Sequence, residues 1–311
     1  MAVVVAAHDQ RYPLESCLKS FGSVVSDPAD LIFVDNGSQS RLDLWAAKHF
    51  PGITCVRNQG NRLFCGGYNT GIQTALDRGY RFVLIANADT EVVNPRFLGE
   101  LVQVAQRQPK AAFIGPLVYF RSTAVVQKTC LDFPSIFRSM LSWVPFRLSP
   151  AYFCRQPDKE RTVEFLNGVC VLCRTEALLE IGLMDERFGG YVEDADWSWR
   201  AGKMGWLSVF SPIPSVIHHE EPVGYEWYSL KTFLLKRNTV LWFLKTGQER
   251  SARFYAIASL LLAWLRMQSN LTASGRKQYA EFLNRLNAAY SGLLSYREPG
   301  PWFGPPLARW T

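Results

Sequence analysis

Hydrophobic and polar positions follow two different periods along the first 120 residues. Short runs rich in Val, Ile and Phe, such as "AVVVAA" at residues 2–7, have the length and composition of buried strands. Between these runs, apolar residues recur at helical spacing, as Leu14, Leu18 and Phe21 do. Strands that alternate with helices predict a parallel sheet with helices on both faces. We expect strands in residues 2–7, 31–38, 53–58, 81–89 and 111–120, of which 31–38 and 81–89 run into polar turn residues. Further strands are predicted at 163–174, 206–210 and 214–220.

The pattern changes twice after residue 120. Residues 121–162 are rich in Phe, Pro, Ser and Arg and show no clear period, so we expect an insertion beside a site or a mobile flap. Strand and helix patterns then resume and continue to residue 225. We therefore divide the chain into an α/β domain at 1–225, a basic amphipathic helical region at 226–295 and a Pro/Gly-rich tail at 296–311.

Composition supports a folded protein in a reducing compartment. Hydrophobic residues make up 48% of the chain and charged residues 20%, which favours a packed core over disorder. Of seven cysteines, only Cys170 and Cys173 form a CxxC, and the second pair that a zinc site needs is missing, so we expect buried free thiols. The N-terminus lacks the basic start of a signal peptide, and no apolar run reaches membrane-spanning length. We expect a cytoplasmic protein.

The net charge of +7 is concentrated near the C-terminus. From residue 225 onward there are twelve Lys/Arg and four Asp/Glu. This charge suits phosphate-rich partners or the inner face of an anionic membrane, and no nucleic-acid motif accompanies it. With Trp242, Trp264 and the run "FYAIASLLLAWLR", the region fits a peripheral membrane attachment or a helical cap, and a homodimer interface would use the same apolar faces.

Several predicted strands are followed directly by polar residues. In a parallel sheet, ligands bind beyond the carboxyl ends of the strands. Asp89, with Asn87 two positions earlier, offers the oxygen ligands that Mg²⁺ or Mn²⁺ shares with a pyrophosphate, and Asp35 could accept a hydrogen bond from a base or ribose. The same residues are also common in plain turns. The candidates at this edge are His8, Asp35, Asn36, Asn87 and Asp89.

Two further segments could take part in a site. "NRLFCGGYNTG" opens a helix, where Gly66 and Gly67 would let a ligand approach the backbone, although the segment matches neither GxGxxG nor a P-loop. "VIHH" places His218 and His219 at a strand end. Neighbours on a strand point to opposite faces, so at most one of these histidines faces the site.

The segment "YVEDADWSWR" gathers three carboxylates in four positions. Asp196 and Arg200 are spaced as an i,i+4 pair on a helix, which accounts for one of them. Glu193 and Asp194 are left in the first helical turn, where a general base for a sugar hydroxyl could sit. Trp197 could stack on a sugar ring or belong to the core.

Together and in this order, these segments resemble the family 2 glycosyltransferases of the GT-A (Rossmann-like) fold, especially the rhamnosyltransferase-like branch. The matching segments are "FVDNGS", "NRLFCGGYNTGI", "IANADTEV", "GLMDERFGGYVEDADWSWRAGKMGW", "VIHH" and "LLKRNTVLWFLK". They run from about residue 2 to 245, with 121–162 unmatched. Two departures are Leu63, where the family usually has Gly, and Ala88, where it usually has Pro.

The resemblance implies an inverting transferase that moves a sugar, with rhamnose as one candidate, from a dTDP-, UDP- or GDP-linked donor. The acceptor would be a hydroxyl of a glycan or lipid-linked saccharide. Asp89 and His218 would hold Mg²⁺ or Mn²⁺, and His218 is preferred to His219 because it follows the apolar strand directly. Asp194 would be the base, with Glu193 as second choice or as a group that orients acceptor hydroxyls.

The resemblance also divides the α/β domain into a half that would bind the nucleotide-sugar and a half that would bind the acceptor. A nucleotide-binding half would cover about 1–118 and an acceptor-side half 119–225. Residues expected at the nucleotide-sugar are His8, Asp35, Asn36, Asn61, Gly66, Gly67, Asn69 and Asn87; those expected at the acceptor are Trp197, Asn167 and Gly168.

Two other classes share this fold. A sugar nucleotidyltransferase should have a Gly-rich basic loop near its N-terminus, which "AAHDQRYPLES" lacks. A non-catalytic relic that only binds nucleotide-sugar or carbohydrate would have lost the base or a metal ligand, whereas Asp89, Asp194 and His218 are all present.

Overall fold

The structure is a computed structural model, and it describes residues 1–9, 11–121, 125–141, 157–219, 229–269 and 272–295. The chain divides into two compact units. The sheet unit comprises Met1–Phe133, Arg155–Asp185 and Glu193–Pro222, and the helical unit comprises Pro134–Cys154, Glu186–Val192 and Val223–Thr311.

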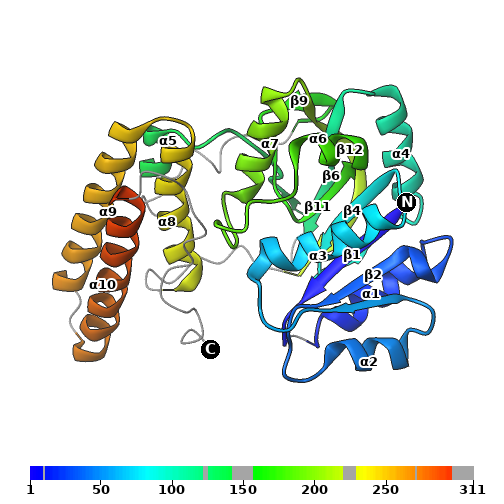
Figure 1. The fold of residues 1–311 in the computed structure, drawn as a ribbon, viewed down its shortest axis with the longest axis horizontal. Helices are drawn as coiled ribbons and strands as arrows, with labels where there is room; N and C mark the ends of the chain where they lie inside the picture. Colours follow the sequence, from blue (N-terminus) through cyan, green and yellow to red (C-terminus); the bar gives the residue numbers. More distant parts are fainter. Residues whose placement is uncertain (10, 122–124, 142–156, 220–228, 270–271, 296–311) are drawn as a thin grey trace. The chain divides into compact units, whose positions relative to one another are not determined.

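The sheet unit is built on one mixed, mainly parallel sheet (Figure 1). Its strand order is β3-β2-β1-β4-β11-β6-β12-β5, with β7 beside β6 and β9 beside β12. β3, β2, β1 and β4 are parallel neighbours, β11 runs antiparallel between β4 and β6, and β12 is parallel to β6. This confirms the predicted α/β class. The strands are β1 (Ala2–Ala7), β2 (Leu31–Asp35), β3 (Thr54–Arg57), β4 (Phe82–Asn87), β5 (Thr90–Val92), β6 (Ala111–Phe120), β7 (Val126–Gln127), β9 (Arg161–Val163), β11 (Cys170–Arg174) and β12 (Leu207–His218).

Helices cover both faces of the sheet, as the alternation along β1 shows. Val3 and Val5 belong to the apolar cluster formed with α1, α2 and α4. Val4 points the other way, toward α3, where Gly71 lies so close that no Cβ would fit. On that same face, Phe113 packs on Trp197 of α7. The helices of this unit are α1 (Leu14–Gly22), α2 (Leu42–His49), α3 (Leu63–Asp77), α4 (Phe97–Arg107), α6 (Thr175–Ile181) and α7 (Glu193–Lys203), with a short 3₁₀ turn, η1, at Pro28–Asp30.

Three predicted strands differ from those observed. The strand expected at 163–174 is split into β10 (Phe165–Leu166) and β11 by the turn at Asn167 and Gly168, and β10 pairs with β8 (Cys130–Leu131) in a small separate sheet. The two strands expected at 206–210 and 214–220 are one, β12, whose register with β6 shifts on both sides of Pro214. Proline has no N–H for the ladder, so the pairing slips while the strand continues.

The segment predicted to lack a period contains short elements. β7, β8 and α5 (Ile136–Leu141) lie within 121–162, and β9 begins there at Arg161. Residues 122–124 and 142–156 of the stretch expected to form an insertion or flap lie outside the described residues, as does the predicted tail at 296–311.

The helical unit contains three long helices that pack side by side (Figure 1). They are α8 (Leu230–Lys245), α9 (Glu249–Ser269) and α10 (Ala273–Ser295). Phe233 of α8 meets Phe282 of α10 edge to face, and the hydroxyls of Ser259 on α9 and Tyr290 on α10 share a 2.8 Å hydrogen bond. None of the helices that the structure describes combines the length and apolar content needed to cross a bilayer.

A buried asparagine on α8 holds another part of the helical unit. The Asn238 amide donates to the carbonyl oxygens of Phe188, Gly190 and Tyr191, at 2.9, 2.7 and 2.7 Å. Tyr191 and the following Val192 have positive φ angles of 66° and 73°. A left-handed backbone is sparsely populated for residues with a Cβ, especially a β-branched one. The Asn238 bonds therefore stabilise a strained turn.

Candidate active site

An open pocket of about 330 Å³ lies at the carboxyl ends of β1, β2 and β4; we call it the edge pocket. It gathers five of the predicted site residues from three separate strands. Its position is the one that a doubly wound sheet provides for ligands. The residues that line it are Ala6, Ala7, His8, Asn36, Asn61, Leu63, Phe64, Tyr68, Asn87, Ala88 and Asp89.

Pairing between β5 and β12 brings Asp89 and His218 together. His218 is the register partner of Thr90, and its Nε2 lies 3.2 Å from Oδ1 of Asp89. Its Nδ1 lies 2.9 Å from Oε1 of Gln127. Because an amide oxygen only accepts hydrogen bonds, Nδ1 carries a proton, and Nε2 is the ring nitrogen that faces the carboxylate of Asp89. Burial raises the pKa of Asp89, but the hydrogen bond and charge of His218 outweigh it, so the pKa lies below its ordinary value.

These residues fit a divalent cation. A carboxylate and an imidazole whose other nitrogen is fixed by a second residue are a common ligand pair. The buried Oδ1 of Asn87, in the same pocket, has no hydrogen-bond partner within the described part of the chain. Among the described residues, no group of three or more His, Cys, Asp or Glu side chains is arranged so that it could hold a metal ion. Further ligands would therefore come from substrate phosphates and water, as Mg²⁺ commonly arranges.

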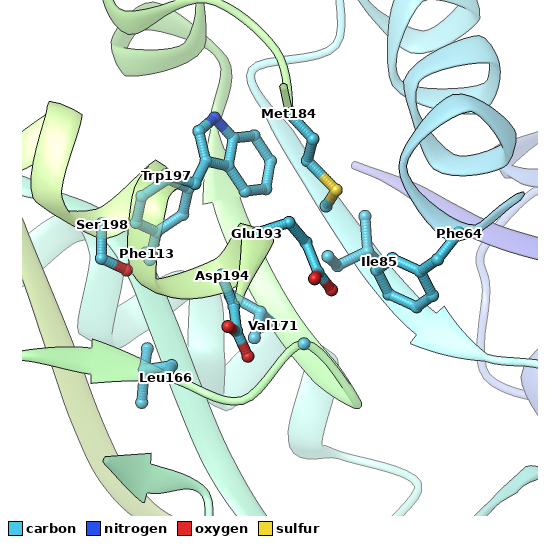
Figure 2. A pocket seen from close by; sticks show the side chains of 11 residues that line it. Phe64, Ile85, Phe113, Leu166, Val171, Met184, Glu193, Asp194, Trp197 and Ser198 are labelled. Atoms are coloured by element: carbon cyan, nitrogen blue, oxygen red, sulfur yellow. The ribbon is translucent and has the colours of Figure 1, made fainter. Parts of the chain in front are cut away.

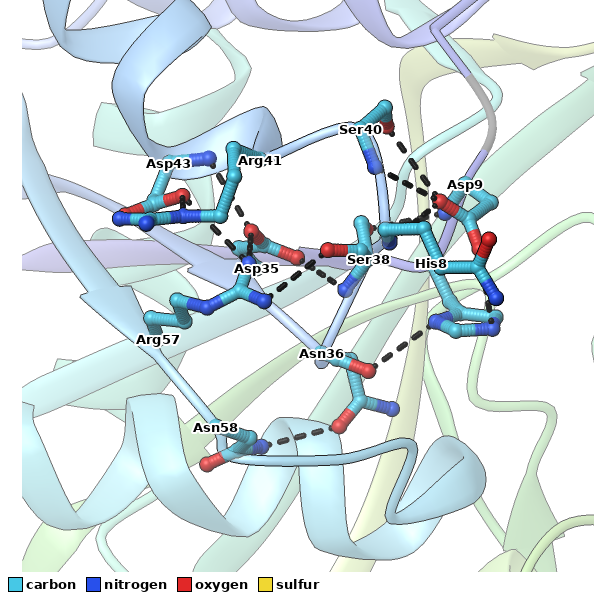
Figure 3. Close-up of polar contacts among 11 residues, drawn as sticks. His8, Asp9, Asp35, Asn36, Ser38, Ser40, Arg41, Asp43, Arg57 and Asn58 are labelled. Atoms are coloured by element: carbon cyan, nitrogen blue, oxygen red, sulfur yellow. Dashed lines mark hydrogen bonds and ion pairs between the residues drawn. The ribbon is translucent and has the colours of Figure 1, made fainter.

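Asp35 is fully buried. Polar contacts surround its carboxylate (Figure 3). Its carboxylate accepts hydrogen bonds from the backbone N–H groups of Ser38 (2.8 Å) and Asp43 (3.2 Å). It also forms an ion pair with Arg57, its register partner on β3. Its oxygens are thus engaged by protein groups, and the prediction that Asp35 reads the base stays a prediction.

Asn36 is the residue after β2 that reaches the edge pocket. Its amide donates to the carbonyl oxygen of Leu63 (2.8 Å) and to Oδ1 of Asn61 (3.2 Å), and its Nδ2 would lie 3.0 Å from a Cβ added at Gly67. Gly67 is therefore small because α3 packs on Asn36. Gly66 and Gly67 are both buried and do not line the edge pocket, so the structure does not show the ligand approach predicted for them.

Asn69 also lies away from the edge pocket. Its side chain exchanges two hydrogen bonds with the backbone of Met184, at 2.9 and 3.0 Å. This buried pair ties α3 to the chain before α7, and the contact of Asn69 with the nucleotide-sugar stays a prediction.

A second cavity lies beside the first turn of α7 (Figure 2); we call it the acidic pocket. Its volume of about 20 Å³ is enough for roughly one water molecule. The carboxyl groups of Glu193 and Asp194 lie in it among apolar side chains. Phe64 lines both this cavity and the edge pocket, so the two adjoin. The lining residues are Phe64, Ile85, Phe113, Leu166, Gly168, Val171, Met184, Glu193, Asp194, Trp197 and Ser198.

Burial raises the pKa of both carboxyl groups in the acidic pocket. Burial and the charge of Asp194 raise the pKa of Glu193 well above its ordinary value, and its buried Oε2 finds no hydrogen-bond partner among the described residues. Burial raises the pKa of Asp194 to about 6, partly offset by the backbone N–H groups of Ala195 and Gly168. Near neutral pH, Asp194 is therefore mostly ionised, while Glu193 holds a proton more readily than an ordinary glutamate does.

The remaining predicted residues of this region have mainly structural contacts. Trp197 is buried, and its indole N–H donates to the Gly182 carbonyl oxygen at 2.8 Å, so it forms a wall of the acidic pocket. The expected Asp196–Arg200 ion pair is confirmed at 2.9 Å. Gly168 lines the pocket, whereas the Asn167 side chain accepts a hydrogen bond from the Val169 N–H at 3.1 Å.

Gln127 belongs to the site, but the sequence did not predict it. Gln127 sets the tautomer of His218, yet it lies in the segment without a recognisable period. It reaches His218 because β7 pairs with β6 at Val118, and β6 pairs with the end of β12. No local pattern signals such a contact.

Comparison with known families decides the class of this site. A model of glycosyl transferase family 2 matches residues 2–182, more than half of the chain. The chain belongs to glycosyl transferase family 2. This glycosyltransferase is thereby confirmed as an enzyme of the predicted family, and the sugar nucleotidyltransferase alternative is set aside.

Two similar proteins have curated names. The glycosyltransferase is 29% identical over 243 residues to the N-acetylglucosaminyl-diphospho-decaprenol L-rhamnosyltransferase of Mycobacterium tuberculosis, which covers 71% of this chain and 76% of the relative. It is 28% identical over 240 residues to the low-salt glycan biosynthesis hexosyltransferase Agl10 of Haloferax volcanii, covering 74% of this chain and 72% of the relative.

Solved structures share its fold. The crystal structure of GalNAc-T7 with UDP, GalNAc and Mn²⁺ matches with a TM-score of 0.59 and 17% identity; the match covers 91% of this chain but 54% of that one, so this glycosyltransferase spans about half its length. The structure of S. aureus TarS 1–349 matches with a TM-score of 0.52 and 11% identity, over 94% and 82% of the two chains. The GT-A-like fold predicted from the motifs is confirmed.

Proposed function

We propose that this glycosyltransferase transfers a sugar, with rhamnose as the first candidate, from a nucleoside diphosphate to a hydroxyl of a lipid-linked saccharide, with inversion. The observation that carries the proposal is that the edge pocket, with Asp89 and His218, adjoins a cavity holding an ionised Asp194. The names of the mycobacterial and haloarchaeal relatives support the sugar and acceptor classes. A lipid-linked acceptor also favours action at the inner face of the cell membrane.

The edge pocket suits the donor. Its volume lies within the range of small-molecule sites, and its polar groups come from His8, Asn36, Asn61 and Asn87. Asp89 and His218 would hold Mg²⁺ or Mn²⁺, which when bound neutralises negative charge on a pyrophosphate leaving group. The structure of GalNAc-T7, which contains UDP and Mn²⁺, supports a nucleoside diphosphate and a divalent cation as the molecules bound here.

Asp194 is the better candidate for the base. It is ionised at neutral pH, and helix α7 fixes its position. It would take the proton of the acceptor hydroxyl while that oxygen bonds to the anomeric carbon and the nucleoside diphosphate leaves from the opposite face. Burial and the charge of Asp194 raise the pKa of Glu193 well above its ordinary value, so Glu193 is better suited to donate a hydrogen bond to an acceptor oxygen than to serve as the base.

The test begins with the donor. Calorimetry against dTDP, UDP and GDP, each with Mn²⁺ and with EDTA, should show metal-dependent binding of one nucleotide that Asp89→Ala abolishes. Transfer from the matching nucleotide-sugar to a polyprenyl-diphosphate saccharide is then followed by NMR of the new anomeric centre. Binding of none of the three nucleotides, or a product that retains the donor configuration, would contradict the proposal.

A further inference from the structure

The outward face of α9 carries a stripe of large apolar side chains. Five of them recur at spacings of three and four residues and are between 45% and 68% exposed. This places them on one side of the helix, over about 17 Å of its length. The stripe consists of Phe254, Ile257, Leu261, Trp264 and Leu265.

Packing within the helical unit does not require these residues. The inner face of α9 is buried, and its residues are mostly small: Ala252, Ala256, Ser259 and Ala263, with Tyr255. A helix shaped only by its core would show the reverse, with large apolar residues inside and polar ones outside. α10 follows that ordinary pattern, because its exposed positions are mostly charged or amide side chains.

The charge around the stripe indicates what covers it. Residues 230–295 contain ten Lys/Arg and two Asp/Glu. Arg250 extends the stripe by one turn toward the N-terminus of α9, Arg253 flanks it, and both are exposed. A second copy of this chain would bring together two surfaces of the same sign, which is unfavourable. Anionic lipid headgroups complement both the arginines and the apolar stripe with its tryptophan.

We propose that α9 docks on an anionic bilayer with Phe254, Ile257, Leu261, Trp264 and Leu265 inserted at the level of the headgroups and Arg250 and Arg253 on lipid phosphates. The helix lies in the plane of the interface and does not cross the membrane. This deepens the proposed function, on which it rests, because a lipid-linked acceptor is presented at that surface.

Flotation of the full chain with lipid vesicles tests the docking face. Wild type should bind vesicles of phosphatidylglycerol and phosphatidylcholine at least tenfold more tightly than vesicles of phosphatidylcholine alone. The variant Ile257→Gln/Leu261→Gln/Trp264→Gln should lose at least tenfold of that binding. The control Leu44→Gln/Leu179→Gln/Met204→Gln removes equally exposed apolar groups from other elements and should bind as wild type does.

The arginines are tested with a matched pair of variants. Arg250→Gln/Arg253→Gln should weaken binding to the anionic vesicles more than Arg276→Gln/Lys277→Gln on α10, which removes the same charge. Equal losses from the two pairs, unchanged binding by the apolar variant, or no preference for anionic lipid would overturn the proposal. So would a wild-type dimer in solution that the apolar variant converts to monomers.

Activity separates this proposal from the proposed function. On a short-chain, water-soluble acceptor, the apolar variant should keep wild-type turnover, which also shows that it folds. If neither wild type nor any variant transferred sugar, the proposed function would be contradicted. Vesicle binding is measured without substrate, so it tests only the docking of α9.

Discussion

The edge pocket and the acidic pocket share Phe64, but they shift the pKa of their aspartates in opposite directions. Asp89, beside His218, has its pKa lowered, and so keeps its charge even under mildly acidic conditions. Asp194, surrounded by apolar side chains, has its pKa raised to about 6. The first environment suits a fixed ligand for a cation, and the second suits a group that must take up a proton. The surroundings of each aspartate, more than its identity, define its role.

The largest effect is expected when the proton acceptor of the acidic pocket is removed, which tests whether the two pockets have separate functions. Asp194→Asn keeps the size of the side chain but cannot accept the proton, so kcat should fall by about 10³-fold. Metal-dependent nucleotide binding at the edge pocket should stay at the wild-type level, since Asp194 does not line that pocket. Steady-state kinetics and calorimetry on the same preparation measure both. A loss of nucleotide affinity as large as the loss of kcat would show that the two pockets are not separate in function.

The same variant should gain stability. The pKa of Asp194 is raised in the folded state, so the folded chain is favoured while the group is protonated, and that advantage is lost as pH rises from about 4 through about 6. Asn does not ionise. At pH 8, Asp194→Asn should therefore raise the free energy of unfolding by about 3 kcal/mol relative to its effect at pH 4. Denaturant titration at the two pH values measures this difference, and a pH-independent effect would refute burial as the cause.

The edge pocket can be weakened through a residue outside it. Gln127→Leu removes the hydrogen bond that fixes the proton on Nδ1 of His218, and such outer partners commonly change metal affinity tenfold to a hundredfold. We expect Mn²⁺ activation to need a correspondingly higher concentration. Gln127→Glu, which restores an acceptor at the same place, should recover most of the affinity. Equal affinities for Mn²⁺ in wild type and Gln127→Leu would remove Gln127 from the site.

The smallest effect is expected at Glu193. Because burial and the charge of Asp194 favour the protonated form of this carboxyl group, Glu193→Gln keeps a neutral hydrogen-bond donor of the same shape, and the rate should change by less than about tenfold. The rate should still fall as pH drops below about 6, because burial, and not a charge on Glu193, raises the pKa of Asp194. Rate profiles from pH 5 to 8 test this. A midpoint that moves to the ordinary range of an aspartate would assign the shift to Glu193.

The class of fold was readable from the sequence, because β1, β2, β3, β4 and β6 are apolar runs with helical patterns between them. The sequence did not predict α2 or β5. The edge pocket was partly readable, since His8, Asn36, Asn87 and Asp89 directly follow strands that end at one edge. Local pattern does not contain strand order, which brings Gln127 to His218.

Two other features also depend on tertiary contacts. Asp35 follows a strand as the site residues do, but its register partner on β3 is Arg57, and that pairing engages its carboxylate. The apolar residues of α9 point to both sides of the helix, and the sequence does not say which side is covered. In the structure, the small residues are the buried ones.

The three bonds of Asn238 have a consequence for how the enzyme is made. Asn238 follows Tyr191 by 47 residues, so at ribosomal rates it is synthesised about 2 to 10 seconds later. During that interval, the turn that leads into Glu193 and Asp194 lacks the amide that holds its carbonyl groups. A nascent chain that stops before α8 thus carries both carboxylates and no clamp for the backbone that precedes them. The backbone that precedes Glu193 and Asp194 is therefore held only after β1 to β12 have all been made.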